Sequence, residues 1–262
     1  MKGGKTVPNK HNVPNEMLRQ DATTLYEEGL AHGVKGETDA AIAAFKKLIG
    51  LDPANAEVWY NLGIAYSKKG AWDDAIFAYR QVTELEPANA SAWNNKGLMH
   101  CRNGETDEAL AAFDIVIRLN PANAEAWYNK GVLHVEKEET DSAIFAFERA
   151  TELDPTNIDA WSNLGLAYCR NGEVETALAA FDAVIRLDPA NAEAWNNKGI
   201  AYSEKEEWGY ALVAFEKATE IDPYNAKAWY NQGAVHDKRG EADEAEACFR
   251  KANECSRGVR AV

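Results

Sequence analysis

Four histidines recur at one position of a repeating pattern and are the first residues to consider for acid–base chemistry. His32, His100, His134 and His236 share this position, and Tyr66, Tyr168 and Tyr202 occupy it in the other copies of the pattern. The exchange of histidine for tyrosine indicates a half-buried ring with a polar tip. No Ser or Asp recurs with the histidines in a triad-like pattern. We therefore expect no catalytic residues and a protein that is not an enzyme.

The cysteines do not form a metal site by their spacing. Cys101 and Cys169 lie two repeats apart, roughly 20 Å at the spacing of packed helices, whereas the ligands of one zinc ion lie about 2.3 Å from it. Cys248 and Cys255 are seven residues apart, which is about 10 Å of rise along a helix. Four scattered cysteines also give no disulfide framework. We expect free thiols, no metal and no cofactor.

A recurring asparagine is the stronger candidate for binding chemistry. It stands in "AEAWYNKG" from Ala124 and returns in every other copy except the first, which has Glu27, although Asn costs roughly 0.5 kcal/mol relative to Ala in a helix. A carboxamide offers both a donor and an acceptor, so a row of them suits a peptide backbone of almost any sequence. The candidate peptide-binding residues are Asn61, Asn95, Asn129, Asn163, Asn197 and Asn231.

Tyrosines stand immediately before three of these asparagines. Tyr60, Tyr128 and Tyr230 alternate with Asn94, Ser162 and Asn196 at this position. Exposed aromatic side chains are good anchors for a partner, so the three tyrosines are further candidate binding residues. The alternative interpretation is that they pack over the edge of a neighbouring helix.

The elements that would position these residues follow from a strict period. Prolines at 53, 87, 121, 155, 189 and 223 and tryptophans at 59, 93, 127, 161, 195 and 229 are each spaced 34 residues apart. The period indicates tandem structural repeats. We expect a flexible segment 1–21, an array over 22–259 and a short tail 260–262. The repeats of the array are 22–55, 56–89, 90–123, 124–157, 158–191, 192–225 and 226–259.

Each repeat has the start and stop signals of two helices. An Asn such as Asn55 ends each of the first six repeats and is the natural N-cap of the next first helix. Position 15 is glycine in five repeats, as a left-handed residue after a helix requires, but Glu138 and Glu206 take its place in two. We expect those two turns to be strained or differently built. Pairs such as Thr106 and Asp107 are expected to cap the second helices.

The repeats resemble the tetratricopeptide repeat (TPR) family. The match is Trp at position 4, Gly at 8, Tyr or His at 11, Ala at 20, Phe or Tyr at 24 and Pro at 32. In the fourth repeat these are Trp127, Gly131, His134, Ala143, Phe147 and Pro155. The resemblance implies an all-α, right-handed superhelical solenoid of seven helix-turn-helix units. Its first helices would line a concave groove.

A helical projection indicates where the asparagines of position 6 point. At 100° per residue they fall about 200° from the tryptophan, on the side turned away from the tryptophan stripe. In the implied solenoid that side faces the groove. The row resembles the asparagine ladder of the O-linked N-acetylglucosamine transferase superhelix, whose glycosyltransferase region has no counterpart in this sequence. The alternative is that each Asn hydrogen-bonds to a neighbouring helix and sets the repeat packing.

Composition limits the partners and the location. The formal net charge is −14 over 262 residues, and no cluster of Lys or Arg offsets it, which argues against nucleic acid. No apolar run is long enough to span a membrane and the first residues lack a secretory signal. We expect a cytoplasmic protein that binds a protein or an extended peptide, with no membrane partner.

Two other interpretations stay open. The seventh repeat lacks a polar capping helix, which favours a homo-oligomeric scaffold that self-associates through its C-terminal end. An isolated or engineered repeat array without a natural partner is the third. The sequence does not decide among them.

Overall fold

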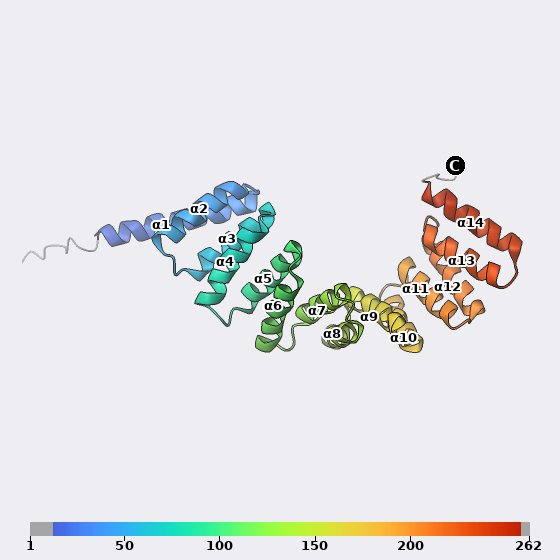
Figure 1. Ribbon diagram of the computed structural model, residues 1–262. Coiled ribbons are helices and arrows are strands. Elements are labelled where there is room, and N and C mark those ends of the chain that lie inside the picture. Colours follow the sequence, from blue (N-terminus) through green and yellow to red (C-terminus); the bar gives the residue numbers. More distant parts are fainter. Residues whose placement is uncertain (1–12, 258–262) are drawn as a thin grey trace, which may run out of the picture. The chain divides into compact units, whose positions relative to one another are not determined.

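The computed structural model describes residues 13–257, with side chains from Asp21 onward, and every regular element in that range is an α-helix. Residues 1–12 and 258–262, which include the expected tail 260–262, lie outside it. The described helices number fourteen and follow one another as seven helix-turn-helix pairs (Figure 1). The predicted all-α repeat fold is therefore confirmed.

The helix bounds follow the predicted repeats closely from the second repeat on. The first helices of the pairs are α1 (Val13–Lys35), α3 (Ala56–Lys69), α5 (Ala90–Asn103), α7 (Ala124–Glu136), α9 (Ile158–Arg170), α11 (Ala192–Glu204) and α13 (Ala226–Lys238). The second helices are α2 (Thr38–Leu51), α4 (Trp72–Leu85), α6 (Thr106–Leu119), α8 (Thr140–Leu153), α10 (Val174–Leu187), α12 (Trp208–Ile221) and α14 (Ala242–Ser256). Residues 13–21, expected to belong to a flexible segment, are helical because α1 already begins at Val13.

The predicted asparagine caps are confirmed at all six first helices from α3 to α13. Asn55 Oδ1, for example, accepts the backbone N–H of Val58 at 3.2 Å, and the equivalent bond recurs at α5, α7, α9, α11 and α13. Each bond satisfies a backbone donor that the first helical turn leaves unpaired. The asparagine caps therefore determine where each first helix begins.

The turns that end the first helices are left-handed, as predicted. Five turn glycines have φ between 75° and 78°, and Glu138 and Glu206 are held at φ 59° in the two repeats that lack the glycine. An L-residue in this region costs roughly 1–2 kcal/mol because its Cβ approaches the following carbonyl oxygen. The predicted strain at these two glutamates is therefore present.

The prediction that Thr-Asp pairs cap the second helices is wrong. The residue at the N-cap of α6 is Glu105, which makes no side-chain capping bond, and Thr106 and Asp107 lie inside the first turn. The Glu105 carboxylate instead lies 2.5 Å from His100 Nδ1. Its engagement with the histidine explains why it does not cap the helix, while Asp107 still favours the positive helix end.

Each helix pair closes by packing an aromatic ring against a glycine. The Phe215 ring of α12 is 1 % exposed, and a Cβ built on Gly199 of α11 would lie 2.6 Å from its edge. The same contact at Gly131 would bring a Cβ to 2.5 Å from Phe147. No side chain fits at that distance, so the glycine at position 8 is required by the close approach of the two helices.

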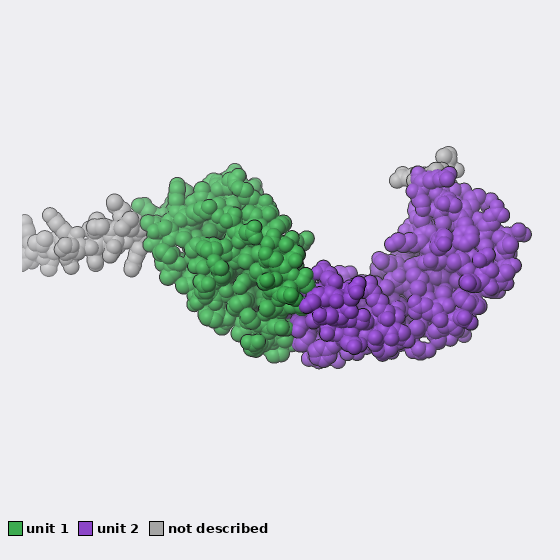
Figure 2. Space-filling model, in the orientation of Figure 1, with its two compact units in different colours: residues 1–121 green, residues 122–262 purple. Residues whose placement is uncertain are grey.

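The chain divides into two compact units, residues 1–121 and 122–262 (Figure 2). Within each unit, the regularly spaced tryptophans form hydrogen bonds between successive repeats. Trp59 Nε1 donates to the Pro53 carbonyl oxygen at 2.9 Å in the first unit, and Trp195 Nε1 donates to that of Pro189 at 3.3 Å in the second. Tryptophan and proline thus hold one repeat to the end of the one before it.

Candidate functional site

A groove of about 1190 Å³ lies in the second compact unit, between α11, α13 and α14. Asn197 of α11 and Tyr230 and Asn231 of α13 line it, and all three belong to the predicted binding residues. The second helix of the last pair, α14, contributes Phe249 and Asn253. Polar amides and aromatic rings thus share one hollow surface.

The other predicted residues lie elsewhere. Asn61 lines a separate cavity of about 150 Å³ in the first unit, beside Leu30 and Ile64. Neither hollow is lined by the remaining candidates, which are Asn95, Asn129, Asn163, Tyr60 and Tyr128. The candidate binding residues therefore do not line one continuous groove: three line the groove of the second unit, one lines the cavity of the first unit, and five line neither.

Several position-6 asparagines donate to the first helix of the preceding repeat. Asn61 Nδ2 donates to the Tyr26 hydroxyl at 2.9 Å, and Asn95 Nδ2 donates to the Tyr60 hydroxyl at the same distance. Asn231 Nδ2 donates to Asn196 Oδ1 at 3.0 Å. These bonds tie repeat to repeat through Nδ2, so the carboxamide oxygen Oδ1 of each residue is not used in the contact with the preceding repeat. One asparagine can thus contribute to repeat packing through Nδ2 and keep Oδ1 as a hydrogen-bond acceptor.

Two further asparagines have other surroundings. Asn163 Nδ2 donates to the backbone carbonyl oxygen of Asp159 at 2.9 Å, four residues earlier in the same helix. Asn129 Nδ2 is buried and has no hydrogen-bond partner among the described residues. A buried unpaired amide costs free energy, so Asn129 is a weak point of its repeat.

Asn196 is a groove residue that the sequence-based prediction missed. It is 6 % exposed, accepts the bond from Asn231, and donates Nδ2 to Asn197 Oδ1 at 3.4 Å. The signal in the sequence was an Asn at position 5, where Tyr60, Tyr128 and Tyr230 stand in alternate repeats. It became informative once the structure placed Asn196 between two candidate residues.

The three predicted tyrosines differ in exposure. Tyr60 packs edge-on against Tyr79 with ring centroids 5.7 Å apart, and Tyr128 packs against Phe147 at 5.9 Å, both half-buried. Burial, with a smaller contribution from Asp159, raises the pKa of Tyr128. Tyr230 contacts Phe249 at 5.4 Å but is 59 % exposed. Of the three, Tyr230 offers the groove the largest aromatic surface.

Charges of both signs line the groove. Glu193 and Asp222 are acidic and Lys227 is basic. Asp222 Oδ1 is already engaged, because it accepts the backbone N–H of Tyr224 at 3.0 Å. The groove itself therefore has no strong preference for a charged ligand.

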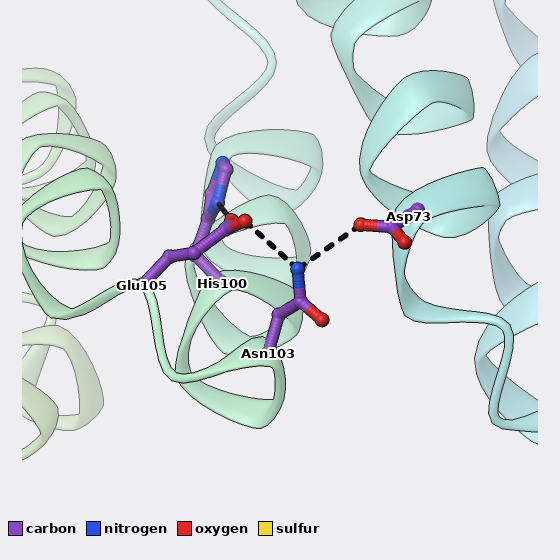
Figure 3. Close-up of polar contacts among 4 residues, drawn as sticks. All are labelled: Asp73, His100, Asn103 and Glu105. Carbon is purple, nitrogen blue, oxygen red and sulfur yellow. Dashed lines mark hydrogen bonds and ion pairs between the residues drawn. The ribbon is translucent and has the colours of Figure 1, made fainter.

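The position-11 histidines pair with the glutamate five residues later. In the first unit the His100–Glu105 pair extends further, because Asn103 Nδ2 donates to Glu105 Oε1 at 2.8 Å and to Asp73 Oδ1 at 3.0 Å (Figure 3). Asp73 belongs to the preceding repeat, so this hydrogen-bond network connects the turn after α5 to helix α4 of that repeat. The hydrogen bond from His100 holds the pKa of the Glu105 carboxyl below its usual value.

Other kinds of site have little support within residues 13–257. No group of three or more His, Cys, Asp or Glu side chains in this range is arranged to hold a metal ion. None of its helices combines the length and the apolar character that crossing a lipid bilayer demands. All four cysteines are free thiols.

Comparison of the sequence with protein families gives consistent matches. Residues 29–70 and 97–138 match the profile described as TPR repeat, and residues 56–89 and 78–111 match profiles described as tetratricopeptide repeat. Residues 121–257, more than half of the chain, match the Cilia and flagella-associated protein 70 C-terminal domain. Among curated proteins, none matches the chain.

Solved structures share the fold. YrrB, described as a TPR protein with an unusual peptide-binding site, is 28% identical with a TM-score of 0.64, over 75% of this chain and 98% of that one. MamA is 30% identical with a TM-score of 0.62, over 66% and 94%. A tetratricopeptide repeat protein from Parabacteroides merdae is 20% identical with a TM-score of 0.65, over 90% and 93%.

Proposed function

The chain belongs to the tetratricopeptide repeat family, and from that premise we propose that it is a non-enzymatic adaptor for an extended segment of a partner protein. The segment would lie in the groove between α11, α13 and α14. The observation that carries the proposal is the hollow of about 1190 Å³ that brings the carboxamides of Asn197 and Asn231 together with the exposed Tyr230 ring. These are the group types that grip a backbone and anchor a side chain.

The spacing of the two carboxamides suits an extended chain. Asn197 and Asn231 occupy the same position on neighbouring first helices, and packed helices lie about 8–10 Å apart. An extended chain advances about 3.3 Å per residue, so the two amides would meet backbone groups roughly three residues apart. A segment of this kind needs no particular sequence at those contacts.

The apolar part of the groove indicates the side chains of the partner segment. Ile200, Tyr224 and Tyr230 are 37 %, 58 % and 59 % exposed beside the amides. Covering such surface gains roughly 25 cal/mol per Å². Because the lining charges are few and of both signs, we propose a largely neutral segment with at least one bulky apolar side chain.

The structural comparisons support a binding role of this general kind. YrrB, which is described as having a peptide-binding site, shares the repeat fold with this chain. The likeness supports the class of ligand, and the groove residues support its location here.

Selection of a phage-displayed dodecapeptide library on the intact chain tests the proposal. The tightest peptide should lose at least tenfold in affinity on Tyr230→Ala, measured by fluorescence anisotropy, because that ring lines the groove. Tyr210→Ala is the matched control, since Tyr210 is 65 % exposed in the same unit but does not line the groove. Failure to select any peptide sensitive to Tyr230→Ala would reject the proposal.

Self-association through the C-terminal repeat is the competing use of the same surface, because α14 contributes to the groove. Sedimentation equilibrium separates the two. A mass that rises with concentration and returns to the monomer value on Tyr230→Ala would assign the groove to a second copy of the chain.

A further inference from the structure

The two groove asparagines present opposite ends of their carboxamides. Asn231 lines the groove and uses Nδ2 for its bond to Asn196, so the bond leaves its Oδ1 available as an acceptor. Asn197 does the reverse, because its Oδ1 accepts from Asn196 Nδ2. Its own Nδ2 has no hydrogen-bond partner among the described residues. Asn61 and Asn95 in the first unit follow the Asn231 arrangement, with Nδ2 turned inward.

The residue at position 5 of the preceding repeat differs between Asn95 and Asn197. Asn95 donates to the Tyr60 hydroxyl, 35 residues earlier in the chain, and the residue that corresponds to Tyr60 for Asn197 is Ser162. A serine hydroxyl stands one carbon from the backbone and has no bond to Asn197 in the structure. With no acceptor on that side, Asn197 instead accepts from its buried neighbour Asn196.

The three amides form a chain of hydrogen bonds in which every donor points the same way along the chain. Asn231 donates to Asn196, and Asn196 donates to Asn197. Asn196 is 6 % exposed, so it has little freedom to turn toward solvent. Turning Asn196 over would set two donors against each other at Asn231 and two acceptors against each other at Asn197, and both contacts would be lost.

We propose that Asn197 is a reversed rung: it donates Nδ2–H to a backbone carbonyl oxygen of the bound segment, while Asn231 Oδ1 accepts a backbone N–H of that segment. Asn196 is the positioning residue that fixes both orientations. This inference rests on the proposed function and adds the pattern of donors and acceptors that the segment must offer. It also excludes proline at the residue facing Asn231, since proline has no backbone N–H.

Two matched pairs of variants test the reversed rung with the display-selected dodecapeptide. Ser162→Tyr supplies the phenol that Asn197 lacks, so Nδ2 turns inward and the affinity should fall about tenfold, the value of one hydrogen bond. Ser162→Ala supplies no acceptor and should bind within about twofold of the wild type. Neither substitution changes a residue that lines the groove.

The second pair changes the rung itself. Asn197→Asp keeps the shape but removes the donor, and the affinity should again fall at least tenfold. Asn163→Asp adds the same charge at the same helix position outside the groove lining, and it should bind within about twofold of the wild type. Far-UV circular dichroism checks the folding of each variant, and Ser162→Tyr decides the matter should Asn197→Asp unfold.

The outcomes separate the two proposals. A peptide that Tyr230→Ala releases but that Ser162→Tyr and Asn197→Asp bind as tightly as the wild type would overturn the reversed rung and leave the groove in place. Equal losses for Ser162→Tyr and Ser162→Ala would overturn it as well. Retention of the peptide by Tyr230→Ala would instead reject the groove.

Discussion

The position-6 asparagines of the first compact unit and those of the second occupy the same helix position but have different surroundings. Asn95 donates to Tyr60 and does not line the groove, whereas Asn197 and Asn231 are joined through Asn196 and line it. The difference originates in the residue at position 5 of the preceding repeat, which is Tyr in one case and Ser or Asn in the others. The hydrogen bonds of a repeated asparagine therefore depend on its neighbour in the preceding helix pair.

The largest effect is expected from replacing Gly199 in α11, one of the helices that line the groove. Gly199→Ala would place a Cβ 2.6 Å from the buried Phe215 ring, and the ring must move. Overpacking of this kind costs about 3 kcal/mol of unfolding free energy. Urea denaturation should show this loss together with loss of peptide binding.

The matched control for that variant lies in the partner helix. Gly209 of α12 has no heavy atom within 4 Å of a built Cβ, so Gly209→Ala should be neutral or slightly stabilising. In the first unit, Gly63→Ala meets Tyr79 at 2.7 Å and should destabilise that unit while peptide binding persists. Loss of binding in Gly63→Ala would contradict the assignment of the groove to the second unit.

A smaller effect should separate two tyrosines at the same helix position. Tyr60→Phe removes the acceptor of Asn95 Nδ2 and should lower the unfolding free energy by about 1 kcal/mol. Tyr230→Phe removes a hydroxyl that has no hydrogen-bond partner among the described residues and should change stability by less than about 0.5 kcal/mol. Thermal melting of the two variants is the measurement, and equal losses would contradict the distinction between the rungs.

Relieving one of the two strained turns in the second unit should increase the unfolding free energy by a similar amount. Glu206→Gly relieves an L-residue at φ 59° and should raise the unfolding free energy by about 1 kcal/mol. Gly172→Ala, at φ 78° in the same unit, should lower it by about as much. Chemical denaturation of both variants gives opposite signs if the left-handed backbone is the cause.

The smallest expected effect is a pH dependence carried by the His–Glu turns. Hydrogen bonds from histidines lower the pKa of Glu37 and Glu105 in the first unit and of Glu139 in the second, from a reference value of 4.5. Their folded-state pKa is below the unfolded one, so this contribution is present above about pH 4.5 and is lost as the pH falls through the folded pKa.

The variant Glu105→Gln tests the sign of this pH dependence of stability. Its urea midpoint should fall less steeply than that of the wild type as the pH is lowered from about 5 to about 3. An identical pH profile for the two proteins would show that the His100–Glu105 bond adds nothing measurable. The side chains of all three glutamates keep more than a third of their surface in contact with solvent, which keeps the effect small.

Much of the fold was predictable because its signals are local. The caps at Asn55 and its equivalents and the left-handed turns depend on a few consecutive residues, and the 34-residue period reveals them repeatedly. The prediction for Thr106 and Asp107 failed because the preceding Glu105 is at the N-cap and its carboxylate contacts His100. The helical projection identified a row of asparagines but could not distinguish one rung from another.

The sequence by itself determined the number of repeats, the start of each first helix and the side of the helix on which Asn197 and Asn231 lie, since all three follow from period, capping and helical geometry. Only the tertiary structure decided which asparagines border a groove and which end of each carboxamide is bonded to a neighbouring residue. Those properties depend on contacts between residues 35 positions apart, such as Asn231 and Asn196. The packing of successive helices brings such residues together, and no pattern within one helix specifies it.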